Sequence, residues 1–154
     1  MGKVSAGLVM YRVRAGGVEV LLVHPGGPFW QNKDSGAWTI PKGEVGKGED
    51  LLAAARREFC EELGVEAAGE FTALSPVKQK GGKVIHAWAF EGELDPAKAK
   101  SNTFEIEWPP RSGKRVAFPE VDRAAFFDLA TAREKINPAQ AKFLDEAERF
   151  AGGA

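Results

Sequence analysis

One stretch decides the fold of this chain: GEVGKGEDLLAAARREFCEELGV, residues 43–65. Its apolar residues recur at spacings of three and four, which places them on one face of a helix. These residues are Leu52, Ala55, Phe59 and Leu63. Gly64 follows directly and is suited to a helix C-cap. The pattern predicts a helix over residues 50–63.

Three glutamates lie beside this apolar stripe. Glu58, Glu61 and Glu62 stand at positions i, i+3 and i+4, so their side chains project from one side of the helix. Like charges at this spacing repel by about 0.2–0.5 kcal/mol per pair, and a bound hard cation would reverse that cost. The alternative is a solvated surface, which is what most helical glutamates form.

The wider register favours the metal site over the solvated surface. Gly43 is followed by five residues and Glu49, then by seven residues and the run REFCEELGV, residues 57–65. From Gly43 to Val65 the chain matches the pattern G-x5-E-x7-R-E-U-x-E-E-x-G-U at all nine defined positions. The chain therefore resembles the Nudix hydrolases, and Phe59 is aromatic where the family commonly has an aliphatic residue.

The resemblance implies roles for the residues of the motif. Glu58, Glu61 and Glu62 would be the ligands of Mg²⁺ or Mn²⁺, with Glu58 also a candidate for activating water. Gly43 would offer its backbone carbonyl to the metal. Arg57 would orient the carboxylates and pair with Glu49 in a buried, charge-assisted hydrogen bond.

Many Nudix enzymes use one further acid from beyond the motif as a ligand or base. Glu120 stands just before an expected last strand at residues 125–127, where that acid would belong. Glu105 and Glu107 are the competing candidates. Surface charge is the alternative for all three.

The lead-in to the motif, Trp38-Thr39-Ile40-Pro41-Lys42-Gly43, resembles that of dinucleoside polyphosphate hydrolases and RNA-decapping members. Lys42 is a candidate phosphate contact, as are Lys78 and Lys80, although most lysines are simply solvated. Trp30 stands in a polar loop and is a candidate platform for stacking a base, although most aromatic residues are core.

The rest of the chain predicts sheet around this helix. Alternating or continuous apolar runs bounded by glycine predict strands, at residues 4–13, 18–24, 70–77, 83–90, 104–108 and 115–118. Asn137-Pro138 is an N-cap and first-turn pair that predicts a final helix. We therefore expect the α/β fold of the Nudix α/β/α sandwich, with a mixed β-sheet, as a single domain over residues 1–154.

The bulk composition narrows the function. A net charge of −1 disfavours a protein that holds long nucleic acid by phosphate neutralisation. No apolar run approaches the roughly 20 residues that cross a membrane, and the single cysteine, Cys60, excludes an internal disulfide. We expect a cytoplasmic protein with a small nucleotide substrate. No heptad or interface stripe predicts its oligomeric state.

The preferred function is metal-dependent hydrolysis of a diphosphate linkage in a nucleoside diphosphate linked to another moiety, such as diadenosine tetraphosphate. Three alternatives stay open. They are a MutT-like pyrophosphohydrolase of ordinary or oxidised nucleoside triphosphates, a pyrophosphohydrolase of RNA 5′ ends, and a non-catalytic nucleotide-sensing module.

Overall fold

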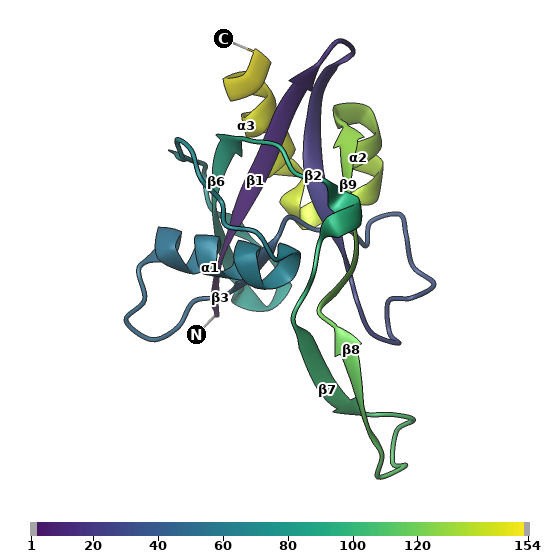
Figure 1. Cartoon of the computed structure of the whole chain (residues 1–154). Coiled ribbons are helices and arrows are strands. Elements are labelled where there is room, and N and C mark those ends of the chain that lie inside the picture. The colour runs from purple at the N-terminus through teal and green to yellow at the C-terminus, as the bar shows by residue number, and fades with distance from the viewer. Residues whose placement is uncertain (1–2, 153–154) are drawn as a thin grey trace.

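The computed structural model describes residues 3–152, and its centre is a mixed β-sheet (Figure 1). The sheet has the order β4-β6-β1-β2-β9, with β3 paired to β1 and β5 paired to β6. Strands β1 and β6 are parallel and every other pair is antiparallel. The bounds are β1 (Val4–Arg14), β2 (Gly17–Pro25), β3 (Lys42–Glu44), β4 (Thr72–Ala73), β5 (Val77–Lys78), β6 (Val84–Glu91) and β9 (Val121–Asp128).

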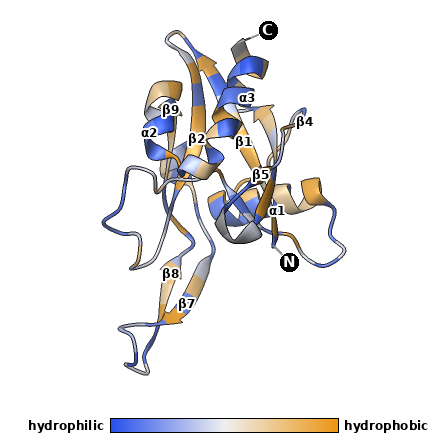
Figure 2. Cartoon of the chain, turned by 180° about the vertical axis from the view of Figure 1, so that it is seen from behind, coloured by the Kyte–Doolittle hydropathy of each residue, from blue (hydrophilic) through white to orange (hydrophobic). Residues whose placement is uncertain are grey.

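Helices cover both faces of this sheet. Helix α1 (Leu51–Leu63) packs on one face, around Leu8, Leu21 and Phe90. Helices α2 (Leu129–Lys135) and α3 (Ala141–Gly152) pack on the other face. Figure 2 shows the reason: the strands β1 and β2 are largely apolar, whereas the helices mix polar and apolar residues and bury one side. The predicted α/β/α sandwich is confirmed.

The remaining elements are short or lie outside the sheet. Strands β7 (Thr103–Glu107) and β8 (Arg115–Pro119) pair with each other in a separate two-stranded hairpin. Residues 3–152 also contain three short 3₁₀ segments: η1 (Lys80–Gly82), η2 (Pro96–Lys98) and η3 (Pro138–Gln140). No helix within the described residues is both long and apolar enough to cross a membrane.

Three predicted elements differ from the structure. The strand predicted at residues 70–77 is wrong over most of its length, because only Thr72–Ala73 and Val77–Lys78 pair with β6 and residues 74–76 separate them. The last strand runs over eight residues, Val121–Asp128, rather than three. The final helix begins as predicted at Asn137, but through the 3₁₀ segment η3.

Helix α2 was not predicted. It has seven residues and buries only Ala132, so its apolar stripe is too short to stand out. A local signal for it exists in Asp128, whose carboxylate accepts a hydrogen bond from Thr131 N as an N-cap.

Candidate metal and phosphate site

Helix α1 is held at both ends by the residues that the sequence indicated. The Asp50 carboxylate accepts a hydrogen bond from Ala53 N, and Gly64 adopts φ +76° and donates to Cys60 O. Phe59 and Leu63 are buried against the sheet. The register that buries these two residues leaves the neighbouring glutamates on the flank of the helix.

Two of these glutamates, Glu58 and Glu62, lie close to a third acid, Glu120, which directly precedes β9. Carboxylate oxygens of Glu58, Glu62 and Glu120 all lie within 4.8 Å of one another. Glu120 stands between β8 and β9, 58 residues after Glu62 along the chain, and reaches the helix through the fold alone. We call these three residues the carboxylate cluster.

The cluster fits a divalent cation. Oε1 of Glu62 is buried and has no hydrogen-bond partner among residues 3–152, which is costly for a carboxylate oxygen unless a cation takes the place of a donor. Three carboxylates so close also repel one another without a cation. Oxygen-only donors of this kind suit Mg²⁺ or Mn²⁺.

Gly43 is required by the position of Glu58. A Cβ atom at residue 43 would lie 2.0 Å from both Cδ and Oε2 of Glu58. Strand β3 therefore passes so close to α1 that only glycine fits. This contact brings the backbone of Gly43 to the edge of the carboxylate cluster.

Burial changes the proton affinity of the cluster. It raises the pKa of Glu62 to about 8, and nearby Lys42 opposes part of that rise. Burial also raises the pKa of Glu58, with Arg57 opposing it, and the pKa of Glu120, where the charges of Glu58 and Glu61 add to the effect. The site thus favours either protons or a metal cation on these carboxylates.

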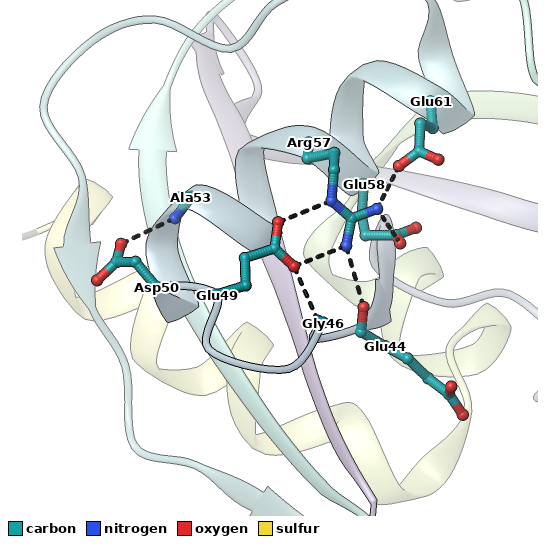
Figure 3. A network of polar contacts seen from close by, with 8 residues as sticks. All are labelled: Glu44, Gly46, Glu49, Asp50, Ala53, Arg57, Glu58 and Glu61. Atoms are coloured by element: carbon teal, nitrogen blue, oxygen red, sulfur yellow. Dashed lines mark hydrogen bonds and ion pairs between the residues drawn. The ribbon is translucent and has the colours of Figure 1, made fainter.

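Glu61 is not part of the cluster. Its carboxylate instead accepts a hydrogen bond from Nη1 of Arg57, which also donates to Glu58 at 2.8 Å (Figure 3). The predicted metal ligand at this position therefore faces a guanidinium in the structure. The predicted set of three helix glutamates is divided between the cluster and Arg57.

Arg57 joins the loop before α1 to the helix. Its Nε and Nη2 donate to the two carboxylate oxygens of Glu49 at 2.8 and 3.0 Å, and Nη2 donates to the Glu44 carbonyl at 3.1 Å (Figure 3). Hydrogen bonds from Arg57 and then from Gly46 N lower the pKa of Glu49 to about 2. The predicted Arg57–Glu49 pair exists, but Arg57 is 40% exposed, so the pair is not buried as predicted.

Lys42 lies next to the cluster and next to a second lysine. Burial, followed by the charge of Lys83, lowers the pKa of Lys42 to about 8, while Glu62 opposes this shift. Lys42 on β3 pairs with Gly7 on β1, where an added Cβ atom would lie 2.7 Å from Lys42 Cβ. Two neighbouring ammonium groups beside acidic residues form a suitable place for phosphate oxygens.

Lys83 was missed by sequence reasoning. A signal existed, because Lys83 precedes Val84 at the start of β6, which pairs with β1 next to the expected metal helix. Of the two lysines predicted instead, Lys78 is exposed on β5. The side chain of Lys80 lies outside what the structure describes, so that prediction is not tested.

The other candidate acids lie elsewhere. Glu105 pairs with Arg115 at 3.5 Å, and Glu107 accepts hydrogen bonds from the backbone nitrogens of Arg111 and Gly113. Among the three downstream candidates, Glu120 is the one that the described structure brings to the helix glutamates.

A cavity of about 140 Å³ opens at the cluster and is bounded by Lys42, Glu62 and Glu120. A larger cavity of about 400 Å³ lies on the other side of Glu62, along Arg123 and η2. Trp30 is 38% exposed, in the loop after β2, and its ring lies under Nζ of Lys33 at 5.1 Å.

Comparison with known proteins agrees with this geometry. The family model described as NUDIX domain matches residues 1–147. An RNA pyrophosphohydrolase of Caulobacter vibrioides is 45% identical over 53 residues, covering 31% of each protein. An asymmetrical bis(5′-nucleosyl)-tetraphosphatase of Caenorhabditis elegans is 44% identical over 61 residues, covering 40% of each. The chain thus matches between about a third and two fifths of the length of these curated relatives.

Solved structures show the same fold. The crystal structure of a C. elegans Ap4A hydrolase binary complex superposes with a TM-score of 0.69, over 97% of this chain and 99% of that one. The sequence identity across that superposition is 24%. The architecture is therefore shared well beyond the short region in which the sequences are alike.

Proposed function

The chain belongs to the NUDIX domain family, and from that premise we propose that it is a metal-dependent hydrolase of a diphosphate linkage. The substrate would be a nucleoside diphosphate linked to another moiety. The observation that carries the proposal is the carboxylate cluster, with its unpartnered buried oxygen on Glu62 and with Lys42 beside it.

The residues divide the chemistry among themselves. Glu58, Glu62 and Glu120 would hold the divalent cation, which would supply charge neutralisation at the diphosphate and lower the pKa of a bound water. Glu58 would accept the proton of the attacking water. Burial raises the pKa of Glu58, and the hydrogen bond from Arg57 opposes that rise.

Arg57 and Glu61 position the cluster rather than bind the cation. Arg57 ties Glu58 and Glu61 to Glu49 in the preceding loop, so the helix and the loop present one fixed set of oxygens. Lys42 and Lys83 bind phosphate oxygens that lie away from the bond being cut.

Dinucleoside polyphosphates are the preferred substrates. Two lysines beside the cluster suit a chain of several phosphates, and the C. elegans relative is named as a tetraphosphatase of this compound class. RNA 5′-end pyrophosphohydrolysis is the second candidate, favoured by the similarity to the C. vibrioides enzyme.

A substrate panel tests the assignment. Diadenosine tetraphosphate, ordinary and oxidised nucleoside triphosphates and 5′-triphosphorylated RNA are incubated with Mg²⁺ or Mn²⁺, and the products are identified. We expect a mononucleotide to be released from diadenosine tetraphosphate. If every compound stays intact with both metals, the chain is not a hydrolase of this class.

Matched variants test the cluster. Glu62→Gln and Glu120→Gln keep the size of the side chain and remove its charge, so kcat should fall at least about a hundredfold. Glu105→Gln changes a downstream acid that pairs with Arg115 instead, and should leave kcat within about twofold. Equal losses of kcat in all three variants would contradict the role of Glu120 in the cluster.

A further inference from the structure

The hairpin of β7 and β8 is a separate apolar surface. We call residues 103–119 the arm, which projects from the main sheet in Figure 1. Its side chains alternate, so that four half-buried apolar residues share one face: Phe104, Ile106, Val116 and Phe118. An isolated two-stranded hairpin is marginally stable in water, so this face needs a cover.

The loop after β2 supplies only part of that cover. We call residues 26–33 the aromatic turn. The Phe29 ring meets Trp108 edge to face, with centroids 5.5 Å apart, and Gly27 lies against the ring of Phe104. Phe29 nevertheless stays 64% exposed and Trp30 38% exposed. Two large rings therefore still present area to solvent beside the arm.

The arm and the turn both begin at the carboxylate cluster. Glu120 directly follows β8, and its carbonyl accepts a hydrogen bond from Gly26 N at 2.9 Å. At the start of β7, Asn102 N donates to the Glu61 carbonyl at 2.8 Å. Trp108, paired with Lys114, lies about 20 Å from Glu120 along the strand. The arm thus leads away from the cluster toward the rings of the aromatic turn.

The aromatic turn is fixed in place at its far end. Nε2 of buried His24 contacts the Lys33 carbonyl at 2.6 Å, and Nδ1 contacts Asp122 at 2.7 Å. Asp34, next in the chain, accepts hydrogen bonds from Trp38 Nε1 and Lys135 Nζ. A turn anchored by these contacts at one end loses less conformational entropy when a ligand binds to it.

The surrounding charges fit an anionic aromatic ligand. Nζ of Lys33 lies over the Trp30 ring, and the arm tip carries the exposed Arg111 and Lys114, which form no ion pair in the described part of the chain. Proteins that bind nucleic acids without sequence preference stack the bases on aromatic rings and contact the phosphates with cationic side chains. An uncharged apolar partner would gain nothing from these cations.

We propose that the aromatic turn and the arm form a subsite for one nucleobase of the substrate. This base belongs to the substrate moiety that lies farther from the carboxylate cluster, and it stacks on Phe29 and Trp30. This inference rests on the proposed function, because it assigns the second half of that substrate. It makes the arm a specificity element of the enzyme.

Binding measurements isolate the base from the phosphate. Calorimetry compares AMP with ribose 5-phosphate in Mg²⁺, because the two differ only in the base and neither contains a diphosphate bond. We expect AMP to bind the unchanged protein at least tenfold more tightly. In the double variant Phe29→Ala/Trp30→Ala that preference should fall below threefold. Phe150→Ala, an exposed ring on α3, is the matched control and should keep it.

Kinetics provide the second readout. The double variant should raise KM for diadenosine tetraphosphate about tenfold with kcat within twofold, and Phe29→Tyr/Trp30→Phe should restore KM. An unchanged AMP preference and an unchanged KM would overturn the subsite. If the double variant differs from the unchanged protein only in its molecular mass in sedimentation, the arm is an interface between copies of the chain and the subsite is wrong. Base-dependent AMP binding without turnover of any dinucleoside polyphosphate would instead defeat the proposed function alone.

Discussion

At the scale of the residue, the site is an arrangement of carboxylates that favours either protons or a bound cation. Three partly buried carboxylates share a space of a few ångströms, and one buried oxygen of Glu62 has no donor in residues 3–152. Arg57 donates to Glu58, and Lys42 is a further positive charge beside Glu62, but burial and Lys83 weaken the hold of Lys42 on a proton. Protonation and metal binding therefore compete for the same oxygens.

That competition predicts the pH dependence of metal binding. With a pKa of about 8, Glu62 carries a proton below that pH in the metal-free protein, and Mg²⁺ has to displace it. The apparent affinity should therefore weaken as the pH falls from 8 to 6, by up to about tenfold per unit. Lys42, charged below a pH of about 8, repels the cation and acts in the same direction.

Calorimetry in buffers of different ionisation enthalpy measures both the affinity and the protons released. Glu62→Gln should abolish most of the proton release. An affinity for Mg²⁺ that does not vary between pH 6 and 8 would contradict the raised pKa of Glu62.

Gly43 gives a second prediction at this scale. In Gly43→Ala the new Cβ would meet the Glu58 carboxylate, which must move away from the cluster. A displacement of about 1 Å costs roughly a hundredfold in rate, so we expect kcat to fall by at least tenfold. Gly16→Ala is the control, because nothing lies within 4 Å of a Cβ atom there. Full activity in Gly43→Ala would show that Glu58 tolerates displacement.

At the scale of the element, α1 is capped at its ends by the neighbouring residues Asp50 and Gly64. One side of the helix packs on the sheet and another carries the glutamates of the cluster. Phe59 and Leu63 anchor it to the sheet, while Glu58 and Glu62 extend from its flank. Its C-terminal end is bonded to the segment before the arm, since Lys100 N donates to the Leu63 carbonyl. A change at Gly64 would therefore disturb both the helix and that segment.

Gly64→Ala should destabilise the protein more than Gly48→Ala. Both glycines have φ near +75°, which costs an alanine about 1–2 kcal/mol. At residue 64 the Cβ atom would also lie 2.9 Å from the Lys100 carbonyl oxygen, whereas residue 48 is open. Urea denaturation of the two variants isolates the packing effect. Equal midpoints would show that Lys100 moves away freely.

At the scale of the whole molecule, the site is closed by residues that lie far apart in the chain. The α/β/α sandwich puts the end of β8 beside α1, and so brings Glu120 to Glu58 and Glu62. A cation bound by all three would link α1 to the junction of β8 and β9. Metal binding and global stability are therefore coupled.

Mg²⁺ should raise the thermal unfolding midpoint. A ligand at a hundred times its Kd stabilises the folded state by about 2.7 kcal/mol, which is several degrees for a chain of this size. Scanning calorimetry with Mg²⁺ and with EDTA measures the shift. Glu120→Gln should reduce it sharply and Glu105→Gln should not. A midpoint that Mg²⁺ leaves unchanged would argue against a cation that bridges the two elements.

Much of this could be predicted locally. The helix at residues 51–63 with its caps, the hairpin of β1 and β2 and the short strands of the arm all follow from patterns within a few residues. Helix α2 could not, because seven residues with one buried side chain carry too little periodicity. The interruption of the strand at residues 70–77 could not be predicted either, because it depends on which of these residues pair with β6.

By itself the sequence determined α1 and its flank of glutamates, because caps and helical periodicity act over one or two turns of chain, while Gly43 was indicated by the resemblance to the Nudix motif. Only the tertiary structure decided that Glu120 completes the cluster, that Glu61 faces Arg57 and that Lys83 stands beside Lys42. It also placed Phe29 against the arm. These contacts depend on strand order and register, which place residues that are distant in the chain within the few ångströms where hydrogen bonds, charges and rings interact.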